Sequence, residues 1–423
     1  MSMRRVAALP TRRNADVVAF CPYDGYEHLL ALGCYELIPE QPPRRVGRLA
    51  LLSTTTTTTT TSGSNDEQCP AAGLVEPTGG DVDDVGVMDC AWLPAAPGCT
   101  SAPRLLAAAT SSGAARLYEL TTTPKVAADD ADDGGAAVSA ATTAGPSATL
   151  RQAGAMVCEG AGDSLMAVAW SGAGAHSAGA EPPLLALSST SGMVYLGELS
   201  AAGGLVLRAS WQAHELEGWA VAFSPHDART LFTGADDAIL KRWDLRMDPD
   251  AGGSNDESGG GDGGGGGGSA AVTVASNRRA HGAGVCCVAP SPVHEHIIAT
   301  GSYDEKARLW DARSLRMPLG EVGCDGGVWR LRWHPQRSEL LLAACMHAGF
   351  AVLRADAPSD AADAASPTAL ERVSTYCEHG TDSSLGYGAD WAYRGAGTPA
   401  DAPLVGATCS FYDQQCHLWT ADL

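Results

Sequence analysis

Two stretches of the chain repeat one another, and this repeat constrains the fold more than any other feature. One reads HELEGWAVAFSPHDARTLFTGADDAILKRWDLR over 214–246, and the other reads HGAGVCCVAPSPVHEHIIATGSYDEKARLWDAR over 281–313. Each contains an apolar run, a Ser-Pro pair, a second apolar run ending in a turn with Asp, and a third run ending in Trp-Asp. This pattern is typical of WD repeats, each of which forms one four-stranded blade of a β-propeller.

Five weaker copies flank these two, and together they predict the architecture. No segment shows sustained helical periodicity, and the part of the 423-residue chain that is not low-complexity divides into seven units of roughly 44 residues each, within the range of one blade. We therefore predict an all-β, seven-bladed WD-repeat β-propeller as a single domain over 1–423. The strand before Asp16 is expected to close the ring by pairing with the last blade. The weaker copies are Asp16–Ile38, Val85–Leu120, Ser164–Leu199, Gly323–Leu353 and Glu378–Trp419.

Four stretches have the composition of insertions rather than of blades. They are rich in Thr, Gly, Ala, Ser and Asp, and they lack an apolar period, so they cannot bury a core. We predict that they are disordered, low-complexity loops, which a propeller tolerates in or between its blades. The predicted insertions are 53–84, 121–150, 247–277 and 355–375.

The two clear repeats also predict the structural tetrad of WD blades. In each, an Asp lies six residues before the Trp, which places the Asp in the turn between the second and third strands. There it is expected to bond a loop His that reaches a hydroxyl of the second strand and the Trp, a network that stiffens a blade when every member is satisfied. The predicted tetrads are His214, Thr233, Asp237 and Trp243, and His281, Thr300, Asp304 and Trp310.

Charge and cysteine content limit the partners and the compartment. Acidic residues outnumber basic ones 49 to 28, giving a formal net charge of −21. Such a chain repels phosphate backbones, so nucleic acid is not expected as a direct partner, whereas a basic protein surface is. No apolar run reaches the roughly 18 residues of a membrane span. The 13 cysteines form no Cys-x-x-Cys pair and no secretion signal precedes them, which predicts reduced thiols in a cytoplasmic protein.

Candidate chemistry gathers in the last two repeats. His347 replaces the tetrad Asp of the sixth repeat, which makes it either a mark of a degenerate blade or a titratable group at the propeller's mouth. His379 is either the tetrad His of the seventh repeat or a base, because its loop is three residues longer than that of the fourth and carries Ser383 and Ser384. A hydroxyl beside a His, oriented by a carboxylate such as Asp390, can act as a nucleophile or position a water. Ordinary loop polarity and structural carboxylates are the alternatives.

Further residues around these loops are candidates for substrate binding. The sixth repeat opens with GCDGGVW, whose glycines allow close backbone approach, as an oxyanion site or merely a turn requires. The chain has no nucleophile elbow, phosphate-binding loop, zinc-protease motif or dinucleotide fingerprint, so no cofactor and no metal are predicted. The candidate binding residues are Asp325, Trp329, Tyr387, Cys409 and Ser410.

Several phrases are more specific than generic propeller sequence. GVWRLRWHP, ACMHAGF, SLGYGADW and ATCSFYDQQCHLW, with the opening CPYDGYEHLLALGCYEL, resemble the WD-repeat diphthine methylesterase family, also named diphthine methyltransferase. The resemblance covers all seven repeats and none of the four insertions. It implies a hydrolase of the diphthamide pathway that cleaves the methyl ester of methylated diphthine on translation elongation factor 2, without a cofactor. The implied partners are elongation factor 2 and other enzymes of that pathway.

A second class of function remains open at the level of sequence. Most propellers only bind other proteins, and fold alone does not decide function. The alternative is a non-enzymatic scaffold or substrate adaptor, in ubiquitin ligation or endosomal recycling. A peroxisomal-type import receptor is a weaker reading, because it rests on the generic repeats only.

Overall fold

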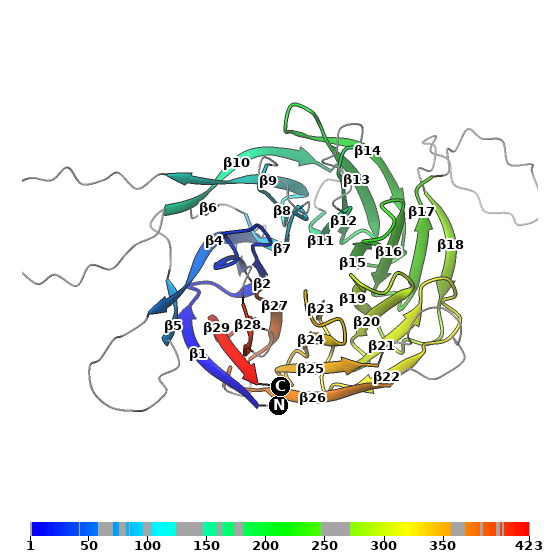
Figure 1. The fold of residues 1–423 in the computed structure, drawn as a ribbon. Coiled ribbons are helices and arrows are strands. Elements are labelled where there is room, and N and C mark those ends of the chain that lie inside the picture. The colour runs from blue at the N-terminus through cyan, green and yellow to red at the C-terminus, as the bar shows by residue number, and fades with distance from the viewer. Residues whose placement is uncertain are drawn as a thin grey trace, which may run out of the picture.

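Every element of the described chain in the computed structural model is a β-strand, and the strands form seven sheets around a central channel (Figure 1). The predicted seven-bladed propeller is thereby confirmed. Each blade is an antiparallel sheet whose first strand lies innermost, except that the last blade takes its outer strand from the N-terminus. The structure describes residues 2–41, 43–57, 71–75, 82–83, 85–95, 103–123, 147–158, 163–172, 181–246, 271–356, 369–380, 384–394, 398–399 and 402–422.

The blades follow one another in chain order, and their strands are named from the inner to the outer edge. The first blade comprises β2 (Ala15–Phe20), β3 (Leu29–Ile38), β4 (Arg44–Thr57) and β5 (Ala71–Val75), with β6 (Val82–Asp83) also paired to β4. The second comprises β7 (Val87–Trp92), β8 (Leu105–Thr110), β9 (Ala114–Thr123) and β10 (Ser147–Val157). The third comprises β11 (Leu165–Trp170), β12 (Leu184–Ser189), β13 (Met193–Leu199) and β14 (Leu205–Gln212).

The remaining four blades repeat this arrangement. The fourth comprises β15 (Gly218–Phe223), β16 (Thr230–Ala235), β17 (Leu240–Asp244) and β18 (Val272–Asn277). The fifth comprises β19 (Val285–Pro290), β20 (Ile297–Ser302), β21 (Lys306–Asp311) and β22 (Gly320–Gly323). The sixth comprises β23 (Arg330–Trp333), β24 (Leu340–Ala344), β25 (Phe350–Ala355) and β26 (Leu370–Tyr376). The seventh comprises β27 (Gly386–Trp391), β28 (Leu404–Ser410), β29 (Gln415–Asp422) and β1 (Ser2–Pro10).

The ring is closed by the pairing of β1 with β29, as the sequence predicts. The register runs antiparallel from Ser2 opposite Asp422 to Pro10 opposite Gln415. Because the N-terminal strand completes the C-terminal blade, the two ends of the chain lie side by side in Figure 1. The pairing gives the last blade four strands like the others and ties the two ends of the chain together, which closes the ring.

The outer strands reach into all four predicted insertions. β4, β5 and β6 enter 53–84, β9 and β10 enter 121–150, β18 lies within 247–277, and β26 begins within 355–375. These strands lie toward the outer edge of their blades, where the composition of a strand resembles that of a loop. The rest of each range lies outside the described residues, and its flexibility stays a prediction.

Neighbouring blades are joined by the aromatic residues that end the innermost strands. In four blades the indole Nε1 of the terminal Trp donates a hydrogen bond to a backbone carbonyl on the inner strand of the preceding blade. The ring packs between the two sheets while its polar atom is satisfied, so one side chain supplies both apolar area and a directional link. The bonds join Trp92 to Ala19 at 3.0 Å, Trp170 to Ala91 at 3.1 Å, Trp333 to Ala289 at 2.9 Å and Trp391 to Arg332 at 3.1 Å.

The fourth blade contains all contacts of its predicted tetrad. His214 Nδ1 lies 3.0 Å from Asp237 Oδ2, and its Nε2 lies 2.7 Å from Thr233 Oγ1. Trp243 Nε1 donates to the same hydroxyl at 2.9 Å. Every polar atom of this buried chain therefore has a partner, which explains why the turn needs an Asp and the loop a His.

The fifth blade departs from the predicted tetrad in one link. His281 Nε2 lies 3.1 Å from Thr300 Oγ1, and Trp310 Nε1 donates to that hydroxyl at 2.8 Å. Asp304, however, is 4.0 Å from His281 Nδ1. The buried Arg308 stands between them and donates to His281 Nδ1 at 3.1 Å and to Asp304 Oδ1 at 3.0 Å. A guanidinium on the third strand thus replaces the direct His–Asp contact.

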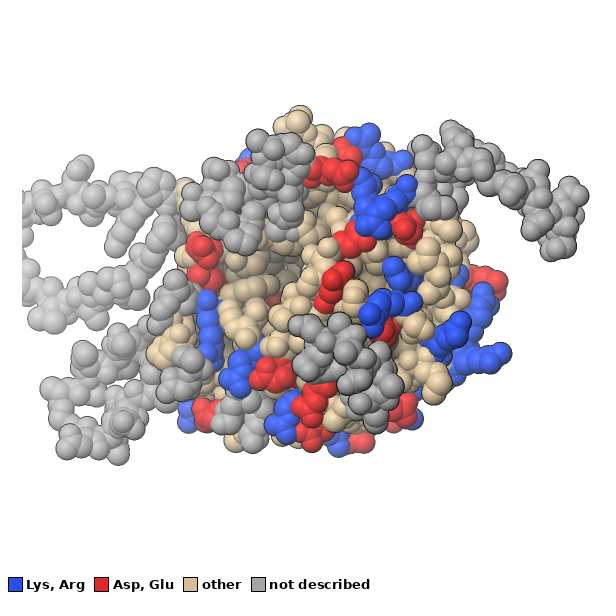
Figure 2. Space-filling view, turned by 45° about the vertical axis from the view of Figure 1, so that its right-hand side comes forward, with Lys and Arg blue, Asp and Glu red and all other residues tan. Residues whose placement is uncertain are grey.

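Acidic and basic side chains are scattered together over the outer surface in Figure 2 and form no block of one sign on the face shown. Among the described residues, no helix is long and apolar enough to cross a membrane. The central channel is lined by both carboxylates and guanidinium groups, and these residues form the candidate site.

Candidate functional site at the channel mouth

One residue near the start of each inner strand is set apart from the strand pairing. In six blades the register between the first and second strands skips one residue, which is a β-bulge, and a bulge re-aims the side chain that it leaves unpaired. In the sixth blade, Trp329 holds the equivalent place directly before β23. We call these seven residues the mouth ring, because they lie where the inner strands begin, at one end of the channel. The ring consists of Asp16, Met88, Met166, Trp219, Cys286, Trp329 and Tyr387.

The aromatic members of the mouth ring lie in contact on one side of the channel. The ring centroids of Trp219 and Trp329 are 5.5 Å apart, and those of Trp329 and Tyr387 are 4.9 Å apart. Tyr303 packs against both indoles, at 6.2 Å from Trp219 and 6.0 Å from Trp329. Phe411 extends the row beyond Tyr387 at 5.4 Å. The result is a row of aromatic rings from the fourth blade to the seventh, half-buried except for the buried Phe411.

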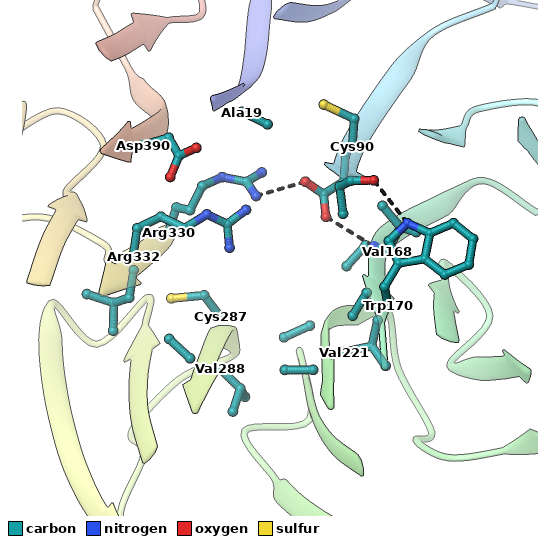
Figure 3. A pocket seen from close by; sticks show the side chains of 18 of the residues that line it. Ala19, Cys90, Val168, Trp170, Val221, Cys287, Val288, Arg330, Arg332 and Asp390 are labelled. Atoms are coloured by element: carbon teal, nitrogen blue, oxygen red, sulfur yellow. Dashed lines mark hydrogen bonds and ion pairs between the residues drawn. The ribbon is translucent and has the colours of Figure 1, made fainter. Parts of the chain in front are cut away.

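An ion pair spans the channel one residue deeper than the ring. Arg330 Nη1, on the inner strand of the sixth blade, lies 2.8 Å from Asp89 Oδ1, on the inner strand of the second blade; Figure 3 labels Arg330 and draws this ion pair as a dashed line. The second oxygen of Asp89 accepts from the backbone N–H of Val168 at 3.0 Å, and Arg330 Nε donates to the carbonyl of Tyr387 at 3.4 Å. The channel has a volume of about 600 Å³, so a small group fits above this pair.

Asp16 is the one carboxyl in the mouth ring. Only 2 % of the residue is exposed, and its Oδ1 has no hydrogen-bond partner among the described residues. Burial raises its pKa from 3.8 to about 7, with Asp89 adding to the rise and Arg330 opposing it. A carboxyl that lines a cavity, lacks a partner and titrates near neutrality has the properties of an acid–base group.

A second carboxyl and a second guanidinium line the channel still deeper, on neighbouring inner strands. Asp390 Oδ2 accepts from the backbone N–H of Phe20 at 2.7 Å. Burial raises the pKa of Asp390 to about 6, although the nearby guanidinium of Arg332 opposes the rise. Both side chains line the channel on adjacent inner strands (Figure 3). The sequence analysis placed Asp390 on an inner strand and grouped it with the loop around His379; its role as an orienting carboxylate stays a prediction.

His379 occupies the tetrad position of the seventh blade. Its Nδ1 lies 3.0 Å from Asp413 Oδ2 and its Nε2 lies 2.9 Å from Thr408 Oγ1. The ring is 4 % exposed and stacks on His417 at 3.8 Å between centroids. Since both ring nitrogens are engaged inside the blade, this geometry favours the structural alternative over the proposed base.

The other loop candidates are close together along the backbone but unconnected by side chains. His347 is exposed on the turn between β24 and β25. The neighbouring Met346 forms an isolated bridge with Gly386, which sets this turn against the start of β27. Ser384 lies two residues earlier and accepts a hydrogen bond from Ser410 Oγ at 3.0 Å. Ser383 lies outside the described residues.

The binding candidates divide between the mouth and other places. Trp329 and Tyr387 belong to the mouth ring. Asp325 is exposed and pairs with Arg372 on the outer strand β26 at 2.6 Å, so it faces away from the channel. Cys409 and Ser410 are fully buried, and burial raises the pKa of the Cys409 thiol, which makes it a core residue.

Four important channel residues were missed by the sequence interpretation. They are Asp16, Trp219, Arg330 and Arg332, all on inner strands. A signal existed: each lies at a fixed offset from the aromatic residue or proline that ends its strand, so aligning the seven repeats on that position puts them in common layers. The described residues contain no group of three or more His, Cys, Asp or Glu that could hold a metal ion.

Comparison with known proteins decides the family. The diphthine methyltransferase of Mus musculus is 31% identical over 403 residues, which cover 93% of this chain and 70% of the mouse protein. The chain belongs to the diphthine methyltransferase family. The proteins of that name from Homo sapiens, 33% identical over 53% of this chain, and the homolog from Dictyostelium discoideum, 34% identical over 49%, agree. The alignments cover 43% and 51% of those two proteins.

Two further comparisons concern the fold. The family model described as WD domain, G-beta repeat, matches residues 273–311, which run from the outer strand of the fourth blade into the fifth. A chain in the crystal structure of the mitotic checkpoint complex superposes with a TM-score of 0.58, covering 100% of this chain and 95% of that one at 14% identity. This likeness shows the propeller fold alone. The comparisons concern the family and the fold, and the roles of individual channel residues are argued from their contacts.

If His379 is a structural member of its blade, its removal must destabilise the fold. Replacing His379 with Ala leaves Asp413 and Thr408 without their partner, so we expect the free energy of unfolding to fall by about 2–4 kcal/mol. His214→Ala removes the matching residue of the fourth blade and is expected to cost a similar amount, as measured by urea denaturation. A selective loss of activity in His379→Ala, beyond that of His214→Ala at equal folded fraction, would contradict this reading.

Proposed function

We propose that this protein hydrolyses the methyl ester of methylated diphthine on elongation factor 2, releasing diphthine and methanol before the final step of diphthamide biosynthesis. Family membership supports a role in that pathway. The reaction needs a base, a group that stabilises the developing oxyanion, and water, but no redox or carbon-transfer cofactor. The channel mouth offers these groups within one site.

The observation that carries the proposal is the unpartnered carboxyl of Asp16 beside the ion pair of Arg330. A base works best when its pKa lies near the working pH, and that of Asp16 is about 7. An ester carbonyl oxygen that enters the mouth meets the positive charge of Arg330 one layer below. Because the side chains of Arg330 and Asp89 are only 11% and 7% exposed, that charge acts more strongly than it would in water.

The carboxylate of Asp16 takes a proton from a water molecule while the water oxygen attacks the ester carbonyl carbon. The carbonyl electron pair moves to its oxygen, where Arg330 stabilises the negative charge. The tetrahedral intermediate then collapses, the bond to the methoxy group breaks, and protonated Asp16 returns its proton to give methanol. The new carboxylic acid releases its own proton to solvent.

His347 and Ser384 are the alternative acid–base candidates, on neighbouring loops. The bridge between Met346 and Gly386 brings their loops together. His347 is exposed and Ser384 is half-buried, so both remain accessible to a protein substrate. Under the Asp16 mechanism, alanine at either position leaves the hydrolysis rate within a few-fold of wild type. A hydrolysis rate reduced about a hundredfold in either folded variant would show that His347 or Ser384, rather than Asp16, takes part in the reaction.

The direct test uses elongation factor 2 purified from cells that lack this protein. Incubation with the purified chain is expected to remove the mass of one methyl ester group from the modified peptide and to release methanol in equal amount. Mass spectrometry of the peptide and an alcohol assay give the two readouts. Stable binding without any methyl loss would contradict hydrolysis and favour the scaffold or adaptor alternative.

A further inference from the structure

The sixth blade has none of the four tetrad side chains, and a cysteine stands at the place of the histidine. Cys324 lies five residues before the mouth-ring member of its blade, the spacing that His214 has in the fourth blade. An alanine, a histidine and a leucine stand where the fourth blade has its Thr, Asp and Trp. These three residues are Ala343, His347 and Leu353. Other contacts must therefore hold the loop of this blade.

A pair of thiols takes over this contact. Cys324 is hydrogen-bonded to the thiol of Cys345, which directly follows the second strand of the blade. Both residues are 1% exposed and belong to one apolar cluster. The backbone fixes the two segments together, because Trp329 N–H donates to the carbonyl of Ala344 at 2.9 Å and a Cβ on Gly326 would collide with the carbonyl oxygen of Cys345. The thiol pair thus joins the loop to the second strand, as the His and Thr do in the fourth blade.

The surroundings make Cys324 the more acidic thiol of the two. The hydrogen bond from Cys345 lowers the pKa of Cys324 and raises that of Cys345. The backbone of Ala307 and the guanidinium of Arg372 also lower the pKa of Cys324, whereas burial and Asp325 oppose them. The residues on either side of Cys324 are exposed, so its sulfur lies directly beneath a surface loop. An acidic thiol in contact with a second thiol is the usual arrangement of a redox-active cysteine.

We propose that Cys324 and Cys345 are a redox modification site, at which a hydroperoxide converts the thiol pair into a reversible disulfide. The Cys324 thiolate attacks one peroxide oxygen, the O–O bond breaks, and the leaving hydroxide takes up the thiol proton to become water. The Cys345 thiol then attacks the sulfur of the resulting sulfenic acid and releases a second water. Two thiols are oxidised by two electrons, hydrogen peroxide is reduced to two waters, and a dithiol reverses the change.

A second thiol pair in the chain provides the matched comparison. Cys409 and Cys416 stand opposite each other on β28 and β29, and both are fully buried. Burial raises the pKa of both thiols, that of Cys416 to about 12. A thiol that stays protonated does not attack peroxide. Closeness of the sulfurs alone would therefore allow two disulfides, whereas the proposed chemistry selects one.

The test treats the whole protein with hydrogen peroxide, alkylates the remaining thiols and maps the peptides by mass spectrometry without reduction. We expect a peptide that links Cys324 to Cys345, lighter by two hydrogens, at least about tenfold more abundant than a link between Cys409 and Cys416. Dithiothreitol is expected to remove it. Cys345→Ala is expected to leave Cys324 as a sulfenic acid that dimedone traps. Cys377→Ala removes an exposed thiol outside the pair and is expected to leave the link unchanged.

Two results would overturn the inference. One is equal cross-linking of the two thiol pairs. The other is oxidation of the exposed Cys377 while Cys324 and Cys345 stay reduced, because it would show that peroxide reached the protein without using the pair. Circular dichroism of the treated protein checks that the link forms in the folded state, and a link found only in an unfolded fraction would count against the site. The readout uses wild-type protein and no substrate, so its outcome is independent of the proposed hydrolysis.

Discussion

Replacing Arg330 with Met is expected to lower the free energy of unfolding by about 3–5 kcal/mol, because it leaves buried carboxyls without their counter-charge. Asp89 loses its partner at 2.8 Å, and Asp16 loses the guanidinium that opposes the rise of its pKa. Methionine fills nearly the same space, so the loss comes from charge rather than from a cavity. Chemical denaturation at pH 7.5 measures it, and hydrolysis is expected to disappear as well.

A double variant separates the charge from the packing. Arg330→Met with Asp89→Asn removes both partners, while the Asn oxygen can still accept from the N–H of Val168. Most of the lost stability is expected to return, because replacing a whole buried pair is often nearly neutral. Hydrolysis is expected to stay absent, because the oxyanion still lacks a cation.

A surface pair provides the matched control for Arg330. Arg354 and Glu371 form an ion pair between the two outermost strands of the sixth blade, and both side chains are about half exposed. Arg354→Met is expected to change the free energy of unfolding by less than about 1 kcal/mol. A similar loss in the Arg330 and Arg354 variants would show that the channel pair does not carry the stability assigned to it.

The fold was predictable because its signals are local and repeated. A Trp-Asp strand end, an Asp six residues earlier and a loop His describe one blade, and counting the copies gives the ring. The outer strands were not recognised, since β18 and β26 face solvent on one side and resemble the adjoining low-complexity sequence. The position of the Arg308 guanidinium between His281 and Asp304 was not predicted either, because Arg308 is not part of the tetrad pattern.

The site was less predictable, because it depends on which residues meet at the centre of the ring. The loop around His379 attracted notice through its length and its polar residues, yet its histidine is engaged by Asp413 and Thr408. Asp16 and Arg330 come from blades one and six, over 300 residues apart in sequence. Only an alignment of the seven repeats on the residue that ends each inner strand shows that Asp16 and Arg330 lie one layer apart, and a single repeat contains no sign of that.

Asp16→Asn is expected to yield a protein that is more stable above pH 7 and nearly inactive. In the folded state the pKa of Asp16 is about 7, above its ordinary 3.8, so the native protein holds this proton more tightly than the unfolded chain does. Its contribution to stability is therefore fully present below pH 3.8 and is lost as the pH rises through 7. Asn mimics the protonated carboxyl at every pH and removes that loss.

The size and the pH dependence of this effect connect stability with function. At pH 8 the Asn variant is expected to unfold with a free energy higher by on the order of 2 kcal/mol, and at pH 3.5 the two proteins should match. Hydrolysis is expected to fall by at least about a hundredfold, since Asn cannot accept the proton of water. At pH 8 the ionised carboxylate of Asp16 therefore destabilises the fold, and the same charge is what the proposed hydrolysis requires. Wild-type turnover in Asp16→Asn, or a stability difference that does not grow between pH 3.5 and 8, would contradict this assignment.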